Sequence, residues 1–205
     1  MIKNIIFDLN KVIVTYENQP NKKYLDKEYK KILGMTQDEF WGKAMVYFDY
    51  YNEGKVDFAG FMKFVFDESQ ISYDKIPLIE RLHERSFNFV EGIEEILIQL
   101  SKNFNLILCA GDGFESSEMK IKNFGLKKYF KRIYVSSYEK TNKKNVFIYE
   151  KILKENKLKA DETLFIDDLL EHIFAARKTG IHSIHFKNSE QLTKDLGKYG
   201  IFVRM

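Results

Sequence analysis

The chain has 205 residues, of which 44% are hydrophobic and 31% charged, with 33 basic and 30 acidic side chains. This composition predicts a globular protein with a sizeable core and excludes a disordered chain. Because the charges are interspersed along the sequence, we expect neither a nucleic-acid nor a membrane partner. No stretch approaches the roughly 18 apolar residues of a membrane span, and no signal peptide is expected. The only cysteine, Cys109, cannot form an internal disulfide, which favours a reducing, cytoplasmic location.

The first predicted element is a buried strand that begins with the apolar run Ile5-Ile6-Phe7 and delivers Asp8 at its carboxyl end. Open α/β sheets bind their ligands at this edge. A buried carboxylate without a partner is costly, so we expect Asp8 to be paired, metal-bound or protonated. The alternative is an Asp that caps the following turn. The polar segment from Thr15 to Lys22, which contains Pro20, predicts a linker that leaves the sheet.

Between about Tyr24 and Phe89 the hydrophobic residues follow a helical period. Thr36 and Glu39 form a capping box before the second of four expected helices. The four helices carry Tyr29–Leu33, Phe40–Phe48, Phe58–Phe66 and Ile79–Leu82. Without any strand signal, this segment predicts a small helical bundle inserted after the first strand. We interpret its aromatic residues as the core of the bundle, with a substrate pocket as the alternative: Trp41, Tyr47, Phe48, Tyr50 and Tyr51.

An alternation of strands and helices then resumes near Val90. Strands are expected at 106–110, 133–136, 163–166 and 183–186, and helices at 93–100, up to 124, at 146–155 and at 171–178. This order predicts the α/β class, with a doubly wound parallel sheet and an inserted helical-bundle cap. The predicted domains are a core of residues 1–16 and 88–205 and a cap of residues 17–87.

Three of the predicted strands end in polar groups, which are Asp8, the turn Ala110-Gly111-Asp112, and the pair Asp167-Asp168. Because parallel strands point their carboxyl ends to one edge of the sheet, we expect these groups to converge. Carboxylates that meet there would repel one another unless a cation held them together. An oxygen-only ligand set favours Mg²⁺.

These motifs resemble those of the haloacid dehalogenase (HAD)-like hydrolase superfamily, in the subgroup with a helical cap between its first two motifs. The resemblance covers nearly the whole chain. Its segments are Phe7–Ile13 for the opening FDxDGVL motif, Asn52–Phe58 for a cap segment, Ser136-Ser137 with Lys143 for the third motif, Leu164–Asp168 for the acidic fourth motif, and Ile181–Phe186 for a final strand. Lys11 replaces a usual glycine and Lys144 a usual proline.

The resemblance implies a Rossmannoid core and Mg²⁺-dependent hydrolysis of a small phosphorylated metabolite. Asp8 would attack phosphorus to form an aspartyl-phosphate, and Lys143 would neutralise the phosphate and the nucleophile together. The backbone N–H of Gly111 would donate to the phosphate. The groups that would hold Mg²⁺ are Asp8, the carbonyl of Asn10, and one or both of Asp167 and Asp168.

Two departures from the family motifs weaken the expected turnover. The family's second aspartate protonates the leaving group, but Asn10 stands there and an amide does not titrate, so about 10²–10⁴-fold of acid–base help is lost. The hydroxyl of the second motif is replaced by Ala110, which removes a phosphate contact worth about 1–3 kcal/mol. Asp112 is either a displaced acid or a turn residue. Ser116 or Ser117 either replaces the missing hydroxyl or caps the next helix.

Three functions therefore stay open. The first is a phosphohydrolase with weakened acid–base catalysis, which would prefer aryl or acyl phosphates because their leaving groups need little protonation. The second is a catalytically impaired protein that binds metal, a phosphate ligand or a protein partner. The third is a dehalogenase-type hydrolase, which is less favoured because those enzymes need no Mg²⁺ and the Asp167-Asp168 pair is retained.

Overall fold

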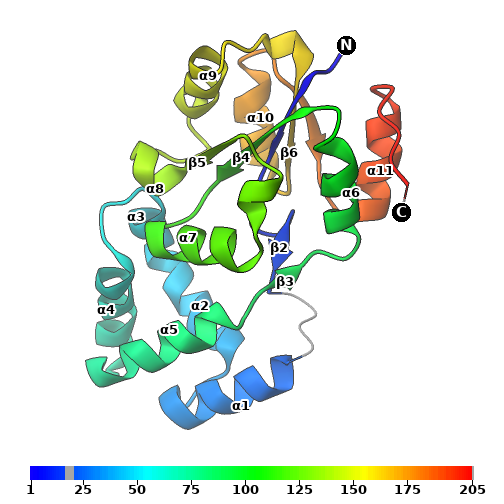
Figure 1. Cartoon of the computed structure of the whole chain (residues 1–205). Helices are drawn as coiled ribbons and strands as arrows, with labels where there is room; N and C mark the ends of the chain where they lie inside the picture. The colour runs from blue at the N-terminus through cyan, green and yellow to red at the C-terminus, as the bar shows by residue number, and fades with distance from the viewer. Residues whose placement is uncertain (17–20, 205) are drawn as a thin grey trace.

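Five parallel strands form the central sheet: β1 (Asn4–Phe7), β4 (Asn105–Ala110), β5 (Arg132–Val135), β6 (Thr163–Asp167) and β7 (His182–His185). In the computed structural model, which describes residues 1–16 and 21–204, their order is β5-β4-β1-β6-β7 (Figure 1). Ile6 at the centre pairs with Ile107 on one side and Phe165 on the other. Its strand is therefore buried on both edges, as an apolar run in a parallel sheet requires. The predicted fold class is confirmed.

Helices cover both faces of the sheet because successive side chains of a strand point to opposite faces. Ile5 and Phe7 belong to one hydrophobic cluster, and Ile6 between them belongs to another. The helices around the sheet are α6 (Ile93–Leu100), α7 (Phe114–Asn123), α8 (Ser136–Glu139), α9 (Val146–Glu155), α10 (Leu170–Arg177) and α11 (Ser189–Gly197), with the short turns η3 (Leu126–Lys128) and η4 (Ala160–Glu162). Side chains from α6 and α11 complete the first cluster, and those from α9 and α10 the second.

The segment between β1 and α6 forms a separate helical layer at one end of the sheet (Figure 1). It contains α1 (Lys22–Leu33), α2 (Gln37–Ala44), η1 (Met45–Tyr47), α3 (Phe48–Asn52), α4 (Phe58–Ser69), η2 (Tyr73–Lys75) and α5 (Ile76–Glu84). The capping box of Thr36 and Glu39 is present. The expected second helix is interrupted by η1, so α2 and α3 are separate helices.

The helical layer has a hydrophobic core of its own, drawn from residues between 25 and 82. Phe40 and Tyr51 are buried in it, whereas Trp41, Tyr47 and Phe48 are partly buried against it. Of the five aromatic residues interpreted from the sequence as bundle core, Trp41, Tyr47, Phe48 and Tyr51 therefore belong to that core. The fifth, Tyr50, is exposed. The domain boundaries remain a prediction, and Pro20 of the predicted linker lies outside the described residues.

Two short strands mark where the chain passes between the sheet and the helical layer. β2 (Val14–Thr15) pairs antiparallel with β3 (Asn88–Phe89). The backbone of β2 is also hydrogen-bonded to the loop that follows Asp8. The N–H of Val14 donates to Leu9 O at 3.0 Å, and the N–H of Lys11 donates to Val14 O at 2.7 Å. Two-residue strands carry no periodic signal, so the sequence did not predict this pair.

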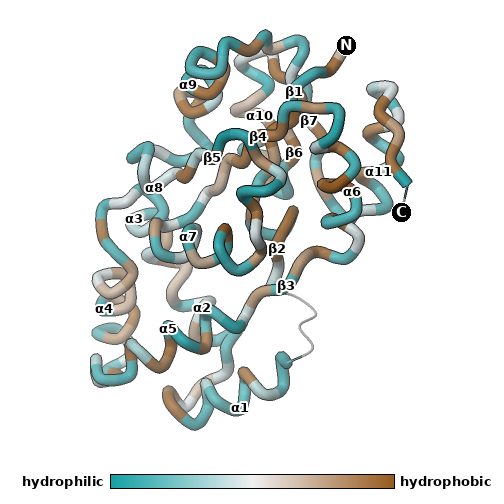
Figure 2. The backbone as a smooth tube through the Cα atoms, viewed as in Figure 1, coloured by the Kyte–Doolittle hydropathy of each residue, from teal (hydrophilic) through white to brown (hydrophobic). Residues whose placement is uncertain are grey.

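Hydrophobic residues concentrate along the strands, whereas the outer turns of the helices are mostly hydrophilic (Figure 2). Cys109 of β4 is buried within the cluster that faces α9 and α10, as expected for a packed thiol. Across residues 1–16 and 21–204, no helix combines the length and the apolar character needed to cross a bilayer.

Candidate active site

The ends of β1 and β6 place two carboxylates side by side around a buried lysine. Asp8 follows β1, and its N–H donates to Ile166 O of β6 at 2.9 Å. Lys143, in the loop before α9, places Nζ 2.5 Å from Asp8 Oδ1 and 2.7 Å from Asp167 Oδ2. The lysine is only 2% exposed. Lys143 is therefore buried between the two carboxylates and not a solvated surface lysine.

Gly111 lets the lysine reach this position. A Cβ atom at residue 111 would lie 2.8 Å from Cε of Lys143, closer than non-bonded carbons approach. The hydroxyl of Tyr149 holds the other end of the lysine, since it donates to Lys143 O at 2.8 Å. Ala110, which ends β4, is fully buried and offers no polar side-chain group.

A third carboxylate completes the cluster. One oxygen each from Asp8, Asp167 and Asp168 lie within 4.8 Å of one another. Burial, together with repulsion from Asp167 and Asp168, raises the pKa of Asp8 well above its usual value, although Lys143 opposes this. Burial and the neighbouring Asp167 also raise the pKa of Asp168. Lys143 therefore offsets only part of the repulsion among the three carboxylates.

Asp167 behaves differently because several donors surround it. Burial alone would raise its pKa, but Lys143 and the hydrogen bond from His172 outweigh this and lower it. Nδ1 of His172 lies 3.0 Å from Oδ1, and the N–H of Leu169 donates to the same oxygen at 2.8 Å. Sequence analysis missed His172. Its only signal is a histidine in the first turns of the helix after the acidic motif.

This set of groups fits a divalent cation. Three carboxylates face one ammonium group, and every available donor atom is oxygen, which suits Mg²⁺. Of the expected ligands, Asp8, Asp167 and Asp168 are the members of this cluster, and the backbone carbonyl of Asn10 stays a prediction.

Asn10 itself is held by a second buried ion pair that sequence analysis missed. Lys120 of α7 donates to Asn10 Oδ1 at 2.8 Å, and Asn10 Nδ2 donates to Asp112 Oδ2 at 3.2 Å. Lys120 and Asp112 are themselves 2.6 Å apart. Burial would raise the pKa of Asp112, but Lys120 outweighs it and lowers the pKa. Asp112 is thus ionised at neutral pH and has no proton to donate, which argues against a displaced acid.

The two serines of α7 do not cap it. The helix begins at Phe114 with Gly113 as its N-cap, so Ser116 and Ser117 lie inside it. Ser116 Oγ donates to Asp112 Oδ2 at 3.0 Å, while Ser117 Oγ is buried without a hydrogen bond. The prediction that one of these serines caps the helix is therefore wrong, because α7 begins at Phe114, before both of them.

The helical layer contacts this part of the site directly. The hydroxyl of Tyr51 accepts a hydrogen bond from the N–H of Ser116 at 3.0 Å. A Cβ atom at residue 113 would lie 2.0 Å from the Tyr51 ring, so Gly113 is required for the approach of α3 to α7. Lys144 lies 3.9 Å from Asp49 of α3 and 3.5 Å from Glu171 of α10. The pair of Lys144 with Asp49 thus bridges the two layers.

His83 of α5 predicts a pH-dependent stability. Its Nε2 lies 3.3 Å from Ser116 Oγ. Burial and the nearby Lys120 lower its pKa to about 3. The pKa of the histidine in the unfolded chain is near 6.5. The contribution of neutral His83 to the free energy of unfolding is therefore complete above about pH 6.5 and is lost as the pH falls toward 3. At pH 5 the loss should be about 2 kcal/mol at most.

Urea unfolding of the wild type and of His83→Phe at pH 7.5 and pH 5 measures this effect. The His83→Phe variant should lose less stability between the two pH values than the wild type. A matched control is His182→Phe, which removes an exposed histidine. Identical pH dependence in wild type and His83→Phe would contradict the expectation.

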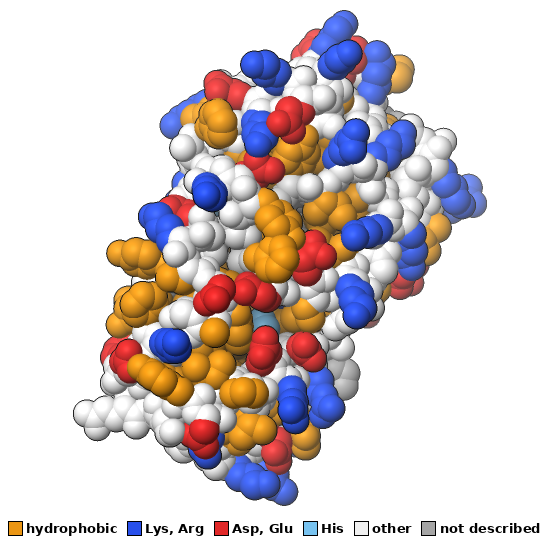
Figure 3. Space-filling model, turned by 60° about the vertical axis from the view of Figure 1, so that its left-hand side comes forward, with side chains coloured by type: hydrophobic (Ala, Val, Ile, Leu, Met, Phe, Trp, Pro, Cys, Tyr) orange, Lys and Arg blue, Asp and Glu red, His pale blue; other side chains and the backbone are white. Residues whose placement is uncertain are grey.

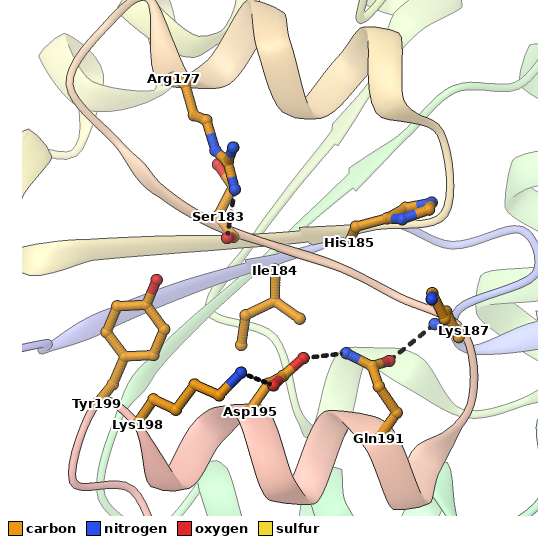
Figure 4. Close-up of a pocket in the computed structure, with 9 residues that line it drawn as sticks. All are labelled: Arg177, Ser183, Ile184, His185, Lys187, Gln191, Asp195, Lys198 and Tyr199. Atoms are coloured by element: carbon orange, nitrogen blue, oxygen red, sulfur yellow. Dashed lines mark hydrogen bonds and ion pairs between the residues drawn. The ribbon is translucent and has the colours of Figure 1, made fainter.

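Two pockets in the described part of the molecule lie away from the carboxylates. One of about 330 Å³ lies between β7 and α11 and is lined by polar residues that pair with one another, such as Asp195 with Lys198 at 2.6 Å (Figure 4). A smaller one lies between α5 and α7, next to His83 and Ser116. On the face shown in Figure 3, acidic side chains gather beside hydrophobic ones near the middle of the molecule. Neither pocket contains a member of the carboxylate cluster.

Residues 5–186 match the haloacid dehalogenase-like hydrolase family. This match spans most of the chain and agrees with the parallel sheet and with the carboxylates at its edge. The chain therefore belongs to the haloacid dehalogenase-like hydrolase family.

Solved structures with the same fold include a HAD family enzyme from Bacteroides thetaiotaomicron in complex with magnesium and inorganic phosphate. It is 20% identical, with a TM-score of 0.73, and covers 92% of this chain and 96% of that one. An L-2-haloacid dehalogenase from Xanthobacter autotrophicus is 14% identical, with a TM-score of 0.68, over 97% of this chain and 83% of that one. A sesquiterpene phosphatase from Aspergillus oryzae is 37% identical over 60 residues, which span 29% of this chain and 31% of that protein.

Proposed function

We propose that this protein is a Mg²⁺-dependent phosphohydrolase that acts through an aspartyl-phosphate on a small phosphorylated metabolite. One observation carries the proposal. The carboxylates of Asp8, Asp167 and Asp168 lie within 4.8 Å of one another, and the ammonium group of Lys143 lies 2.5 Å from Asp8. This arrangement combines a nucleophile, oxygen ligands for a metal and a cation for the phosphoryl group.

In this mechanism the carboxylate of Asp8 attacks phosphorus, and the bond from phosphorus to the leaving-group oxygen breaks. Lys143 offsets the charge of both the carboxylate and the transferring group. The N–H of Gly111 donates to a phosphate oxygen. Mg²⁺, when bound, would stabilise the negative charge on the phosphoryl oxygens. Water then cleaves the acyl phosphate, which releases phosphate and restores Asp8.

Asn10 limits the range of substrates. Its carboxamide cannot transfer a proton, so the leaving group departs as its own anion or takes a proton from water. Aryl and acyl phosphates have leaving groups that are stable as anions, whereas alkyl phosphates do not. The phosphate bound to the Bacteroides relative and the phosphatase activity in the name of the Aspergillus relative support a phosphorylated substrate. The buried thiol of Cys109 supports a cytoplasmic location.

A second candidate is a catalytically impaired protein that binds metal, a phosphate ligand or a protein partner. The observation that favours it is the engagement of Asn10 by Asp112 and Lys120. The apolar Ala110 at the end of β4 points the same way. The presence of all four expected side chains for nucleophilic attack, charge neutralisation and metal binding argues against it. They are Asp8, Lys143, Asp167 and Asp168.

Phosphate release from an aryl phosphate and from an alkyl phosphate, with Mg²⁺ and with excess EDTA, tests the proposal. We expect activity on the aryl substrate to exceed that on the alkyl substrate by about 10²-fold or more, because only the alkyl leaving group needs an acid. EDTA should abolish both. Equal rates on both substrates would contradict the role given to Asn10. Metal binding without turnover would favour the second candidate, and halide release without metal would indicate a dehalogenase.

A further inference from the structure

Asn10, Asp112 and Lys120 form a closed ring of polar contacts beside the carboxylate cluster. The three distances are 2.6 Å between Lys120 Nζ and Asp112 Oδ2, 2.8 Å between Lys120 Nζ and Asn10 Oδ1, and 3.2 Å between Asn10 Nδ2 and Asp112 Oδ2. Asp112 is 1% exposed and Lys120 is 3% exposed. Asp112 lies in the loop between β4 and α7, and Lys120 lies in α7. Asn10 lies in the loop that follows Asp8. The ring therefore joins the nucleophile loop to α7.

Both ions are fully engaged within the protein. Asp112 also accepts hydrogen bonds from the N–H of Gly113 at 2.9 Å and from Ser116 Oγ at 3.0 Å. The ammonium group of Lys120 lies 4.1 Å from the centre of the Phe87 ring, a cation–π distance. With its partners Asp112, Asn10 and Phe87, the lysine has a contact for each of its three hydrogens. Neither ion is placed to exchange a proton with a substrate, so any effect on catalysis passes through Asn10.

We propose that Asp112 and Lys120 are positioning residues that fix the orientation of the Asn10 carboxamide. A carboxylate only accepts hydrogen bonds and an ammonium group only donates them, so Oδ1 must face Lys120 and Nδ2 must face Asp112. The second hydrogen on Nδ2 is then available to the leaving-group oxygen. Asn10 becomes an oriented hydrogen-bond donor in place of a proton donor. This catalytic consequence rests on the proposed function, whereas the orientation itself does not.

Exchanging the amide and the carboxylate tests the orientation without any substrate. Asn10→Asp alone places two carboxylates against one ammonium group, and Asp112→Asn alone leaves Lys120 buried without a carboxylate. The double variant has one carboxylate and one amide again. We expect each single variant to lower Tm by on the order of 5–15 °C and the double variant to recover at least half of the larger loss. Additive losses, or a double variant less stable than either single one, would overturn the proposal.

A matched control separates this effect from the loss of an ordinary ion pair. Glu94 and Lys128 form an exposed pair at 3.2 Å. Glu94→Gln and Lys128→Met should each change Tm by no more than about 2 °C. If these controls cost as much as Asp112→Asn, the buried pair has no special role.

Kinetics with an aryl and an alkyl phosphate test whether the orientation of Asn10 affects catalysis. Asp112→Asn should lower kcat on the aryl phosphate by about tenfold or more with little change in KM, because the donor at Asn10 loses its fixed direction. The double variant should not gain kcat on the alkyl phosphate over wild type, since the carboxylate at residue 10 would pair with Lys120 and hold no proton to donate, as Asp112 does in the wild type. An unchanged aryl kcat in Asp112→Asn would refute the positioning role.

The two proposals fail separately. If the Asp8→Asn variant retains full activity, the proposed function falls, but the Tm values of the exchange variants still decide whether Asp112 and Lys120 orient Asn10. If the exchange variants show only additive losses while activity still depends on Asp8, only the positioning role is lost.

Discussion

Replacing Asp8 with asparagine is expected to lower the kcat for phosphate release by on the order of 10⁴-fold or more, because an amide does not attack phosphorus. The same variant should not lower Tm in the absence of Mg²⁺. It removes one of three clustered carboxylates and leaves Lys143 paired with Asp167 at 2.7 Å, and the new amide can still accept the hydrogen bond from Leu9 N–H. Phosphate-release kinetics and thermal unfolding of the purified variant measure the two effects.

A large loss of kcat without a loss of Tm distinguishes a nucleophile from a structural carboxylate. Asp74→Asn is the matched control, because Asp74 is an exposed residue of the helical layer whose ion-pair partner is the neighbouring Lys75 at 2.8 Å, and both quantities should stay within error. Retained activity in Asp8→Asn would place the nucleophile elsewhere. A large drop in Tm would show that Asp8 mainly stabilises the fold.

Replacing Lys143 with methionine should be the most destabilising of the substitutions considered. It leaves Asp8 and Asp167 buried together without their shared cation, which costs about 3–5 kcal/mol for a broken buried pair. For a chain of this size, that corresponds to a fall in Tm of roughly 6–20 °C. Activity should fall by at least about 10²-fold, since the side-chain cation that offsets the charge of Asp8 and of the phosphoryl oxygens would be lost.

Mg²⁺ provides the discriminating measurement for Lys143→Met. The variant should gain more Tm from added Mg²⁺ than the wild type gains, because the ion would supply the charge that the lysine no longer provides. Lys128→Met serves as the control, with a small Tm change and the same response to Mg²⁺ as the wild type. Wild-type stability in Lys143→Met without metal would contradict the buried pairing.

Much of the fold was predictable because local patterns and tertiary packing agree. The apolar runs before Asp8 and Asp167 are strands, and the helix at Val146–Glu155 has the expected bounds. The helix at Ser189–Gly197 and the strand pair of Val14 with Phe89 were not predicted. The first of these lies in a polar segment, and the second depends on contacts between residues 75 positions apart, which no local period records.

Some residues of the candidate site could be predicted from the sequence, and others could not. Asp8, Lys143, Asp167 and Asp168 come together because topology brings the ends of parallel strands to one edge, and topology follows from the alternation of elements. Lys120 could not be found this way. In the sequence it resembles the neighbouring Lys122, and only the contact across 110 positions with Asn10 makes it different. Asn10 itself was identified as a departure, but its partners emerged only in three dimensions.

The strand pair that joins the two layers has a mechanical consequence. The two passages of the chain are tied to each other by hydrogen bonds, and β2 is tied in turn to Leu9 and Lys11, the residues on either side of Asn10. A rotation of the helical layer would pull on this ribbon as one unit, and the ribbon would transmit the pull to the loop that carries Asn10. The strand pair and the loop that carries Asn10 are therefore parts of one continuous linkage.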